Sequence, residues 1–527
     1  MASIVPNKIG KYTYLYESVS YRDENGKPQT RKTSIGKLDP ITGNPIYKPE
    51  YLERIRATGK ELPSDVKQYS KDDIMHSTVQ EFGVFYLLES ISEEIGLTTI
   101  LKKVVKKRWE QILTLAFYMV ATGDPAVYCE DWIMKSESLA CGKMSSQNIS
   151  ELLRVITNEE RLNFHEKWCA LRNEKEYFAL DITSISSYSE LIGDVEWGYN
   201  RDNEKLPQIN VCLLLGEESQ LPVLQTTYSG SITDVTTLKS TLQLASNLKL
   251  TNISIVMDKG FSKKENIDAM LNDEDGIRFI IPAPFTMNFT KNLITQEKKT
   301  IDTPENTIVL GQDIVRGVTK LSDWHSTHKI YAHVIVNTGL LYHKKNKLYG
   351  EVAMLRQEAL ENPTNPKRTK NSMKYLSIRK SNKESSGYTV KIKQKTIDEE
   401  LAHKAAVVLL SNHIDNATEA LKIYRAKDVV EKGFMKLKNC LDLGRIRVHS
   451  DQRMNNKLFI GFIALILMAH IHKVMSDNNM YEKTSLKKML KSLERLRIQY
   501  INGDRILFPA TKEQKEIFKA FGFPVPV

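Results

Sequence analysis

Continuous runs of apolar residues in the middle of the chain predict buried strands. The stretches on either side of the fourth predicted strand predict helices. Each run is bulky and ends at glycine or at polar residues, which is typical of buried strands. The predicted order is three strands, a helix, a strand, a helix and a strand. These elements lie at 177–180, 209–215, 221–230, 233–248, 253–257, 262–271 and in a final run that ends near Pro284.

Two aspartates stand where two of these predicted strands end. Asp181 directly follows the apolar residues of the first strand, and Asp258 directly follows those of the fourth. A buried aspartate is costly unless something pairs with it, so two of them at strand ends suggest a shared cation. The alternative is that each aspartate caps its strand or the helix that follows.

A third carboxylate lies on a predicted helix further along the chain. Tyr424, Lys427, Glu431 and Lys438 are spaced so that they return to one broad helix face. A carboxylate between two ammonium groups and a phenol suits a metal ion beside a phosphate. An ordinary amphipathic helix with solvated charge pairs gives the same pattern, but the two aspartates upstream favour the metal site.

The order of the elements resembles the ribonuclease-H-like core, a mixed sheet flanked by helices whose first three strands are antiparallel. In that fold the carboxylates converge at one side of the sheet. A helix that returns after the fifth strand can bring Glu431 to Asp181 and Asp258. We therefore expect an α/β protein with a ribonuclease-H-like catalytic core.

The chain also resembles the DDE transposases of the IS4 group, and most of all the IS1634 family. The family hallmark is Tyr-x2-Arg-x3-Glu-x6-Lys, which holds here at Tyr424, Glu431 and Lys438. Lys427 stands in place of the arginine, which keeps the charge but loses the planar fork that binds phosphate with two hydrogen bonds. Weaker resemblance lies in residues 17–39, 198–215, 226–238, 258–262 and 511–524.

The resemblance implies a set of roles for these residues. Asp181, Asp258 and Glu431 would hold two divalent cations, Mg2+ or Mn2+, since oxygen ligands suit such hard ions. Tyr424, Lys427 and Lys438 would position phosphates of DNA. Members of the IS4 group also suggest cleavage through a DNA hairpin and a synaptic complex with one catalytic site for each DNA end.

The interval between Asp258 and Glu431 is too long for a single crossover between neighbouring strands. It holds strand-like pieces, and IS4-type transposases carry a β-rich insertion here, so we expect an inserted, largely β domain at 285–405. Its middle is strongly basic, and it is either a surface loop or a DNA contact. The basic residues are Arg356, Lys367, Arg368, Lys370, Lys374, Arg379 and Lys380.

The N-terminal third is predicted to be separate from the core. Residues 11–36 alternate in polarity around Asn25-Gly26, a strong hairpin signal, and the hairpin is either a DNA-binding ribbon or simply solvated. A charged linker with a short helix is expected at 40–73, and helices from Thr78 onward. The expected helix that opens at 102–108 with five basic residues offers a phosphate contact or a solvated face.

Composition agrees with a DNA-binding protein without requiring one. The formal net charge is +11 and the sequence pI is about 9.0, which favours a polyanionic partner. The five cysteines form no CxxC pair, and the N-terminus has no apolar signal core, so we expect a reducing cytoplasm and action at the nucleoid. The apolar run 458–469 is shorter than the roughly 20 residues of a membrane span, which predicts a buried helix and no membrane partner.

These observations predict a function and a division of the chain. We expect a transposase that binds the inverted-repeat ends of its element, cuts the DNA and joins the 3′ ends to a target, as a homodimer on DNA. A related nuclease without strand transfer, or a non-catalytic DNA-binding protein of transposon origin, are the alternatives. The expected regions are an N-terminal hairpin and linker (1–75), a helical DNA-binding region (76–172), the core (173–284 and 406–480), the insertion (285–405) and a basic C-terminal tail (481–527).

Overall fold

The computed structural model describes the chain except residues 1, 11, 40–42, 59–68, 141–143, 173–175, 233, 249, 251–252, 274–275, 298–299, 326–327, 362–369 and 382–387. Lys367 and Arg368 of the predicted basic segment lie outside the described residues. The chain divides into two compact units. The first is Met1–Thr78 with Gln499–Ile506, and the second is Val79–Ile498 with Leu507–Val527.

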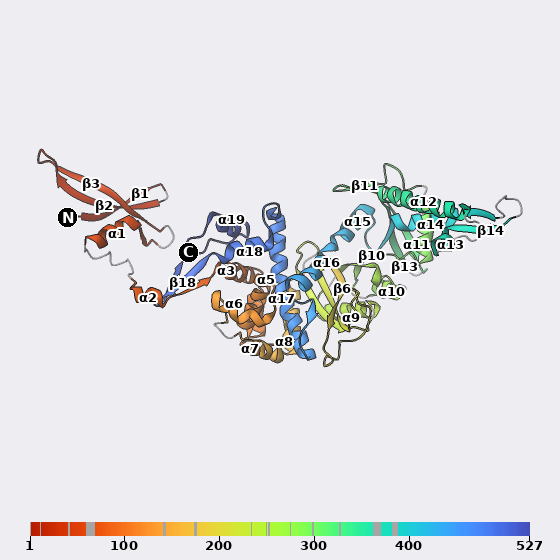
Figure 1. Ribbon diagram of the computed structural model, residues 1–527, viewed down its shortest axis with the longest axis horizontal. Helices are drawn as coiled ribbons and strands as arrows, with labels where there is room; N and C mark the ends of the chain where they lie inside the picture. Colours follow the sequence, from red (N-terminus) through yellow and green to blue (C-terminus); the bar gives the residue numbers. More distant parts are fainter. Residues whose placement is uncertain are drawn as a thin grey trace. The chain divides into compact units, whose positions relative to one another are not determined.

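The first unit is built on an antiparallel sheet of four strands in sequence order (Figure 1). The turn between the second and third strands contains the predicted Asn25-Gly26 pair, and Gly26 has a φ of +74°, which glycine adopts without strain. The elements are β1 (Ala2–Ile9), β2 (Tyr12–Arg22), β3 (Pro28–Leu38), β4 (Pro45–Tyr47), α1 (Pro49–Ala57) and α2 (Lys71–Met75). The predicted hairpin is thus the centre of a larger sheet.

Helix α1 belongs to this sheet and is not part of a linker. Its Tyr51 and Ile55 pack on Leu15 and Ile35 in one small buried cluster. Residues 40–73 therefore include the expected short helix, but this helix closes a small core instead of lying in a linker.

The second unit opens with helices that precede the large sheet. The apolar stripe of α3 is buried throughout, and Leu87, Leu88 and Ile91 have no exposed surface. The elements are β5 (Thr78–Glu81), α3 (Gly83–Glu94), α4 (Leu97–Val104), α5 (Trp109–Thr122), α6 (Cys129–Lys135), α7 (Ser146–Val155) and α8 (Asn158–Leu171). The basic run 102–108 ends α4 and precedes α5, so it does not open a helix as expected.

The centre of the second unit is a mixed sheet with the predicted order of strands and helices. Its strands run β8-β7-β6-β9-β10, where β6, β7 and β8 are antiparallel and β9 and β10 run parallel to β6. This is the topology of a ribonuclease-H-like core. The elements are β6 (Tyr177–Ser187), β7 (Gln208–Gly216), β8 (Pro222–Ser229), α9 (Asp234–Asn247), β9 (Ser254–Met257), α10 (Lys264–Leu271) and β10 (Arg278–Pro282).

Two layers of helices cover this sheet. One face packs on α9, α10 and α11 (Asn288–Glu297) through a large apolar cluster that includes Leu180 and Met257. The other face packs on α15 (Ala417–Ala426) and α16 (Asp428–Met435), and Val256 points to this second side.

The expected β-rich insertion is mainly an extension of the core sheet. Beyond β10 the sheet continues in the order β16-β13-β12-β11, with every neighbouring pair antiparallel. The strands are β11 (Thr307–Leu310), β12 (Asp313–Trp324), β13 (His328–Val336) and β16 (Ala406–Ser411). Three strands of the region 285–405 therefore share one sheet with the candidate site, which differs from the expected separate β domain.

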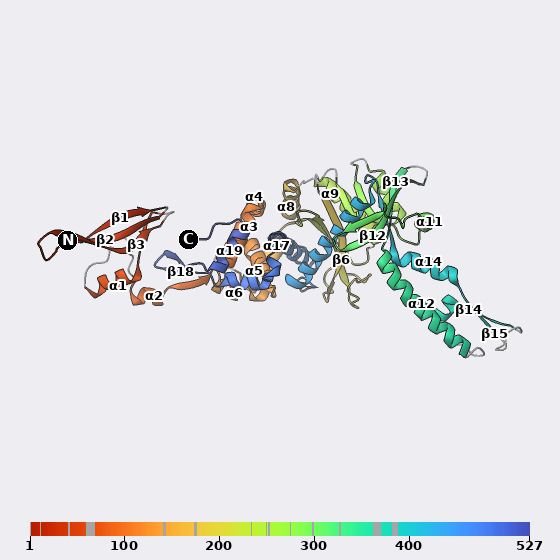
Figure 2. The same ribbon diagram turned by 90° about the horizontal axis from the view of Figure 1, so that it is seen from above.

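The rest of this region is mostly helical. Between β13 and β16 the chain forms α12 (Thr338–Glu361), α13 (Lys370–Tyr375), the hairpin β14 (Leu376–Lys380) and β15 (Tyr388–Ile392), and α14 (Gln394–Ala405). Helices α12 and α14 pack together around a separate apolar cluster and lead away from the sheet (Figure 2).

The C-terminal part is folded and is not a tail. Helix α18 (Leu486–Glu494) packs on α3 and on α19 (Lys512–Ala520), and the Phe518 ring lies 5.4 Å from the Tyr86 ring. The remaining strands of this part are β18 (Arg497–Ile501) and β19 (Asp504–Leu507), whereas β17 (Arg445–Ile446) pairs with β6 of the core sheet.

Helix α17 (Asp451–Asp477) contains the apolar run of the sequence. It packs on α5, α7 and β8, and 78% of its most apolar window is buried inside the protein. By length and composition alone α17 passes the test for a membrane span, and the bent pair 109–122 and 126–135 passes it together. A mostly buried helix passes the same test when it forms the core of a protein.

Candidate active site

The two predicted aspartates lie side by side on neighbouring parallel strands. Asp181 lies within β6 and Asp258 directly follows β9, and Leu180 is paired with Met257 in the register of these strands. The next position on each strand is an aspartate, and adjacent strands are about 4.8 Å apart. Because Leu180 points to α9 and α10, the alternation of side chains turns Asp181 to the other face, toward α15 and α16.

The carboxyl group of Asp181 has a raised pKa. The pKa is about 6, mainly because of desolvation, and the charge of Asp258 also contributes to the rise. The Ile182 N–H, which donates to Asp181 Oδ1 at 2.8 Å, and the cations of Lys427 and Arg201 oppose this rise. Asp181 is therefore a partly buried acid close to a second acid and two cations.

The helix that carries the third carboxylate is interrupted twice. The chain forms α15, then Lys427 at the junction, then α16, and then the π-helical turn Lys436–Cys440. We had expected one helix face from Tyr424 to Lys438. A π turn closes hydrogen bonds five residues apart, so the positions after it no longer follow the α-helical spacing.

Lys427 is the cation at the centre of this cluster. Its ammonium donates to Glu431 Oε1 at 3.0 Å, and the residue is only 6% exposed. Burial lowers the pKa of Lys427, but the Glu431 hydrogen bond and the charges of Asp181, Asp258 and Glu431 outweigh burial and raise it. A buried lysine is thus held charged by three carboxylates.

Tyr424 belongs to the same cluster. Burial is the main cause that raises the pKa of the Tyr424 hydroxyl, and the charges of Asp258, Glu431 and Asp181 raise it further, while Lys427 lowers it. Tyr424 therefore stays a neutral phenol that can donate a hydrogen bond. The structure brings together five of the six predicted site residues.

Close packing sets the position of α16 over the sheet. The helix contacts β6 and β7, and Gly433 faces the Leu215 side chain on β7. A Cβ atom at Gly433 would lie 3.0 Å from Leu215 Cδ2, a contact that few real side chains make. Glycine at this position therefore lets α16 lie close to the strand that neighbours Asp181.

The sixth predicted residue, Lys438, has a different partner. Its ammonium donates to Asp202 Oδ2 at 2.6 Å, and its side chain is 13% exposed. Asp202 lies in the connection between β6 and β7. By contrast, Lys432 pairs with Asp428 at 2.7 Å on the exposed surface of α16, where it is 62% exposed.

The connection between β6 and β7 supplies residues that the sequence analysis did not assign. Arg201 lowers the pKa of Asp181 by its charge, and Asp202 and Glu204 bind Lys438 and Arg445. The segment 198–215 already carried part of the family resemblance, and its charged residues were the available signal.

The carboxylates do not form a closed metal site. Within the described residues, no group of three or more histidine, cysteine, aspartate or glutamate side chains is arranged to hold a metal ion. Glu431 is turned to Lys427 and its side chain is 59% exposed. The residues nevertheless fit a hard divalent cation, because their donors are carboxylate oxygens and because they already hold one buried positive charge, that of Lys427.

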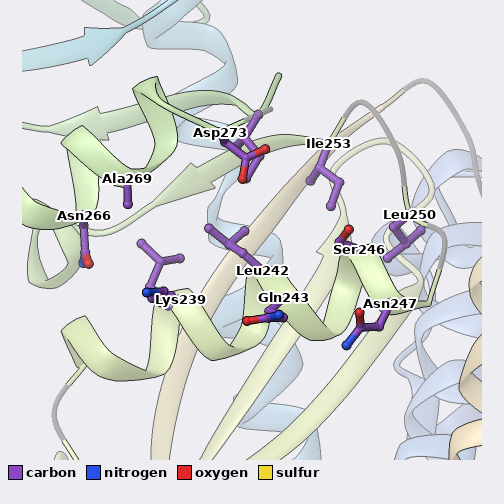
Figure 3. A pocket seen from close by; sticks show the side chains of 12 residues that line it. Lys239, Leu242, Gln243, Ser246, Asn247, Leu250, Ile253, Asn266, Ala269 and Asp273 are labelled. Atoms are coloured by element: carbon purple, nitrogen blue, oxygen red, sulfur yellow. The ribbon is translucent and has the colours of Figure 1, made fainter. Parts of the chain in front are cut away.

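A pocket elsewhere on the core is unrelated to these carboxylates. It lies between α9 and α10 and is lined by Leu242, Ile253 and polar residues such as Gln243 (Figure 3). These helices cover the face of the sheet opposite to the side chain of Asp181. The pocket is therefore not part of the candidate active site.

One comparison with known proteins, a match to a family model, agrees with this assignment of the core. The family model described as "Transposase DDE domain" matches residues 172–467, a range that contains all six candidate residues. No curated protein matches the chain. Among solved structures, a cryo-EM structure of the piggyBac transposase synaptic complex with hairpin DNA is similar at a TM-score of 0.32 and 10% sequence identity, covering 84% of this chain and 74% of that one.

The family model covers enough of the chain to assign the protein to the family. It begins just before β6 and ends within α17, so it includes both parts of the core and everything between them. It spans more than half of the sequence. The chain therefore belongs to the transposase DDE domain family.

Proposed function

We propose that this protein is a cut-and-paste DNA transposase of the IS4 group, similar to the IS1634 family. It binds the inverted-repeat ends of its own insertion sequence, hydrolyses phosphodiester bonds there and joins the 3′ ends to target DNA. It acts on DNA of the nucleoid in a prokaryotic cytoplasm. Asp181, Asp258 and Glu431 are its catalytic carboxylates.

The observation that carries the proposal is the adjacency of Asp181 and Asp258 beneath α16. Two carboxylates on neighbouring parallel strands share one face of the sheet, and Lys427 links both of them electrostatically to Glu431. Placing a partly desolvated carboxylate beside a second one costs free energy, and such pairs occur mainly at functional sites.

Each residue has a task in the proposed reaction. Two cations, Mg2+ or Mn2+, held by the three carboxylates would supply an activated water or 3′-hydroxyl and stabilise the leaving oxygen. Asp181 must lose its proton to bind a cation, which its pKa of about 6 allows at neutral pH. Lys427 and Lys438 offer positive charge to phosphates, and Tyr424 offers a hydroxyl hydrogen bond.

Lys438 reaches a phosphate only by changing partner. Its ammonium is bound to Asp202, so an incoming DNA phosphate has to replace that carboxylate. The exchange is between two charge-assisted hydrogen bonds and therefore costs little. Asp202 then acts as the resting partner of Lys438 when no DNA is bound.

The active form is proposed to be a homodimer on two DNA ends. One chain carries one set of Asp181, Asp258 and Glu431, and joining two ends in one event requires that both are held together. The partner molecules are thus duplex DNA and a second copy of this chain.

The test is cleavage of a duplex that carries the DNA flanking the reading frame, with Mg2+. We expect Asp181→Asn, Asp258→Asn and Glu431→Gln each to abolish cleavage while DNA binding stays largely intact. Asp428→Asn is the matched control, because Asp428 is an exposed acid on the same helix as Glu431 and pairs with the exposed Lys432. A triad variant that cuts at a nearly normal rate would remove that residue from the site.

A second assay separates transposition from simple nuclease activity. Pre-cut ends with free 3′-hydroxyls are incubated with a supercoiled target, and the joined products are counted. A transposase joins them in a reaction that depends on Asp258. Cleavage without joining would identify the related nuclease, and binding without cleavage would identify a non-catalytic DNA-binding protein.

A further inference from the structure

The sheet of the first unit has two faces with different surroundings. Leu15 and Glu17 of β2 point to the side of α1, because Leu15 packs on Tyr51 and Ile55 and because Glu17 forms an ion pair with Arg54. Side chains alternate between the two faces along a strand, and residues paired across neighbouring strands point to the same face. The register of the strands therefore assigns each position to one face. Within the described residues, no core cluster covers the second face.

The second face has a distinct composition. It is built from the positions that alternate with Leu15 and from their partners on the neighbouring strands. No acidic side chain occurs among its described residues. They are Ser3, Val5, Asn7, Ile9, Tyr12, Tyr14, Tyr16, Ser18, Ser20, Arg22, Pro28, Thr30, Lys32, Ser34, Lys37 and Ile46.

The chemistry of this face suits nucleic acid. Three cations, Arg22, Lys32 and Lys37, lie among hydroxyl and amide groups, and the Lys37 ammonium lies 5.8 Å from the centroid of the Tyr12 ring. Cations on such a surface neutralise phosphates, whereas hydroxyl and amide groups both donate to and accept from base edges. The large aliphatic residues described on this face are Val5, Ile9 and Ile46. They are paired with Tyr16, Tyr12 and Lys37 on the neighbouring strands, so a hydroxyl or an ammonium group accompanies each of them.

The dimensions of the ribbon fit duplex DNA. β2 and β3 are 11 residues each, which at roughly 3.3 Å per residue gives a length of about 36 Å. One turn of B-DNA is about 34 Å long, and its major groove is about 12 Å wide and admits a two-stranded ribbon.

We propose that this second face of β1, β2 and β3 binds duplex DNA, with the β2–β3 ribbon in the major groove of the element end. The inference rests on the proposed function, because the end of the element is the duplex that such a transposase must recognise. The surface belongs to the first unit and the carboxylates belong to the second, so the proposed role of the surface is recognition and not chemistry.

The matched pair for the test is Lys32 and Arg31. They are neighbours on β3 and both are exposed, but Lys32 pairs with Ser18 on the second face and Arg31 pairs with Val19 on the face of α1. Full-length Lys32→Ala and Arg31→Ala proteins are titrated by fluorescence anisotropy into a duplex that carries the flanking DNA. A scrambled duplex of equal composition is the reference.

We expect Lys32→Ala to reduce the slope of log affinity against log salt concentration by about 0.9. If the variant and the unaltered protein bind equally at ~1 M salt, this slope means that the variant binds about eightfold more weakly at ~0.1 M salt. Arg31→Ala should leave both quantities unchanged. Ser20→Glu, which adds a negative charge to the same face, should weaken binding in the same direction and provides a second variant. Thermal unfolding of each variant checks that the fold is kept.

A chemical footprint identifies the groove. Methylation of guanine N7, in the major groove, should interfere with binding of the unaltered protein, and methylation of adenine N3, in the minor groove, should not. The inference would be overturned if Lys32→Ala and Arg31→Ala lost affinity for the duplex equally, or if Lys32→Ala lost none. It would also be overturned if only methylation of adenine N3 interfered with binding. Cleavage that still depends on Asp258 in that case would leave the proposed function standing.

Discussion

Replacement of Asp181 by asparagine should stabilise the fold while it removes activity. Desolvation raises the pKa of Asp181 from its ordinary value of 3.8 to about 6 in the folded protein. A shift of about two units corresponds to roughly 3 kcal/mol at 1.36 kcal/mol per unit. This is the cost of holding the ionised carboxylate in its buried position, and an uncharged asparagine does not bear it.

The sign of the pH dependence follows from the direction of the shift. Between pH 3.8 and about 6 the folded protein binds the Asp181 proton more tightly than the unfolded chain does. Stability contributed by this group is therefore lost as pH rises through that window. The free energy of unfolding of the Asp181→Asn protein should exceed that of the unaltered protein by about 3 kcal/mol at pH ~7.5 and by about 1 kcal/mol at pH ~4.5.

The assay is urea unfolding of the two full-length proteins in EDTA at both pH values. Asp428→Asn is the control, because this exposed acid pairs with the exposed Lys432, and such pairs contribute little to the free energy of unfolding. The reasoning would be refuted if the asparagine protein were no more stable at pH ~7.5, or if its advantage were the same at pH ~4.5.

Further variants test the surroundings of the carboxylates. Lys438→Ala should lower cleavage markedly because it removes a nearly buried cation, whereas Lys432→Ala should have a weak effect; a cleavage assay that finds equal effects would remove Lys438 from the site. Lys427→Met should lower cleavage and raise the affinity for Mn2+, measured by electron paramagnetic resonance, because a competing buried cation is gone. Light scattering should show mainly monomer in free solution and a dimer on two end duplexes, and a complex of one chain and one duplex that completes joining would contradict this.

The sequence predicts the centre of the fold well because its signals there are local. Apolar runs followed by Asp181 and Asp258 identify two buried strands, and the intervening helical patterns imply parallel neighbours. The position of β16 between β10 and β13 has no such local signal, because its partners lie far away in the sequence. For that reason the sequence predicts an inserted, largely β domain where the structure has an extension of the core sheet.

For the candidate site, the sequence predicts which residues lie near one another but not how they are arranged. The spacing of Tyr424, Lys427 and Glu431 identifies the residues, and the structure brings them together. No proline or glycine marks the break at Lys427 or the π turn that follows Met435, so periodicity alone predicts one continuous helix. The partner of Lys438 lies on a distant connection between strands, which spacing along a helix does not reveal.

The two interruptions explain why Glu431 differs from the two aspartates. Asp181 and Asp258 are fixed by the hydrogen bonds of neighbouring strands, whereas Glu431 lies on a short helix between a junction and a π turn. Its carboxylate is held by one ammonium, that of Lys427. If Asp181, Asp258 and Glu431 hold divalent cations, Glu431 would have to leave Lys427, and the Lys427 ammonium would then be available to a phosphate.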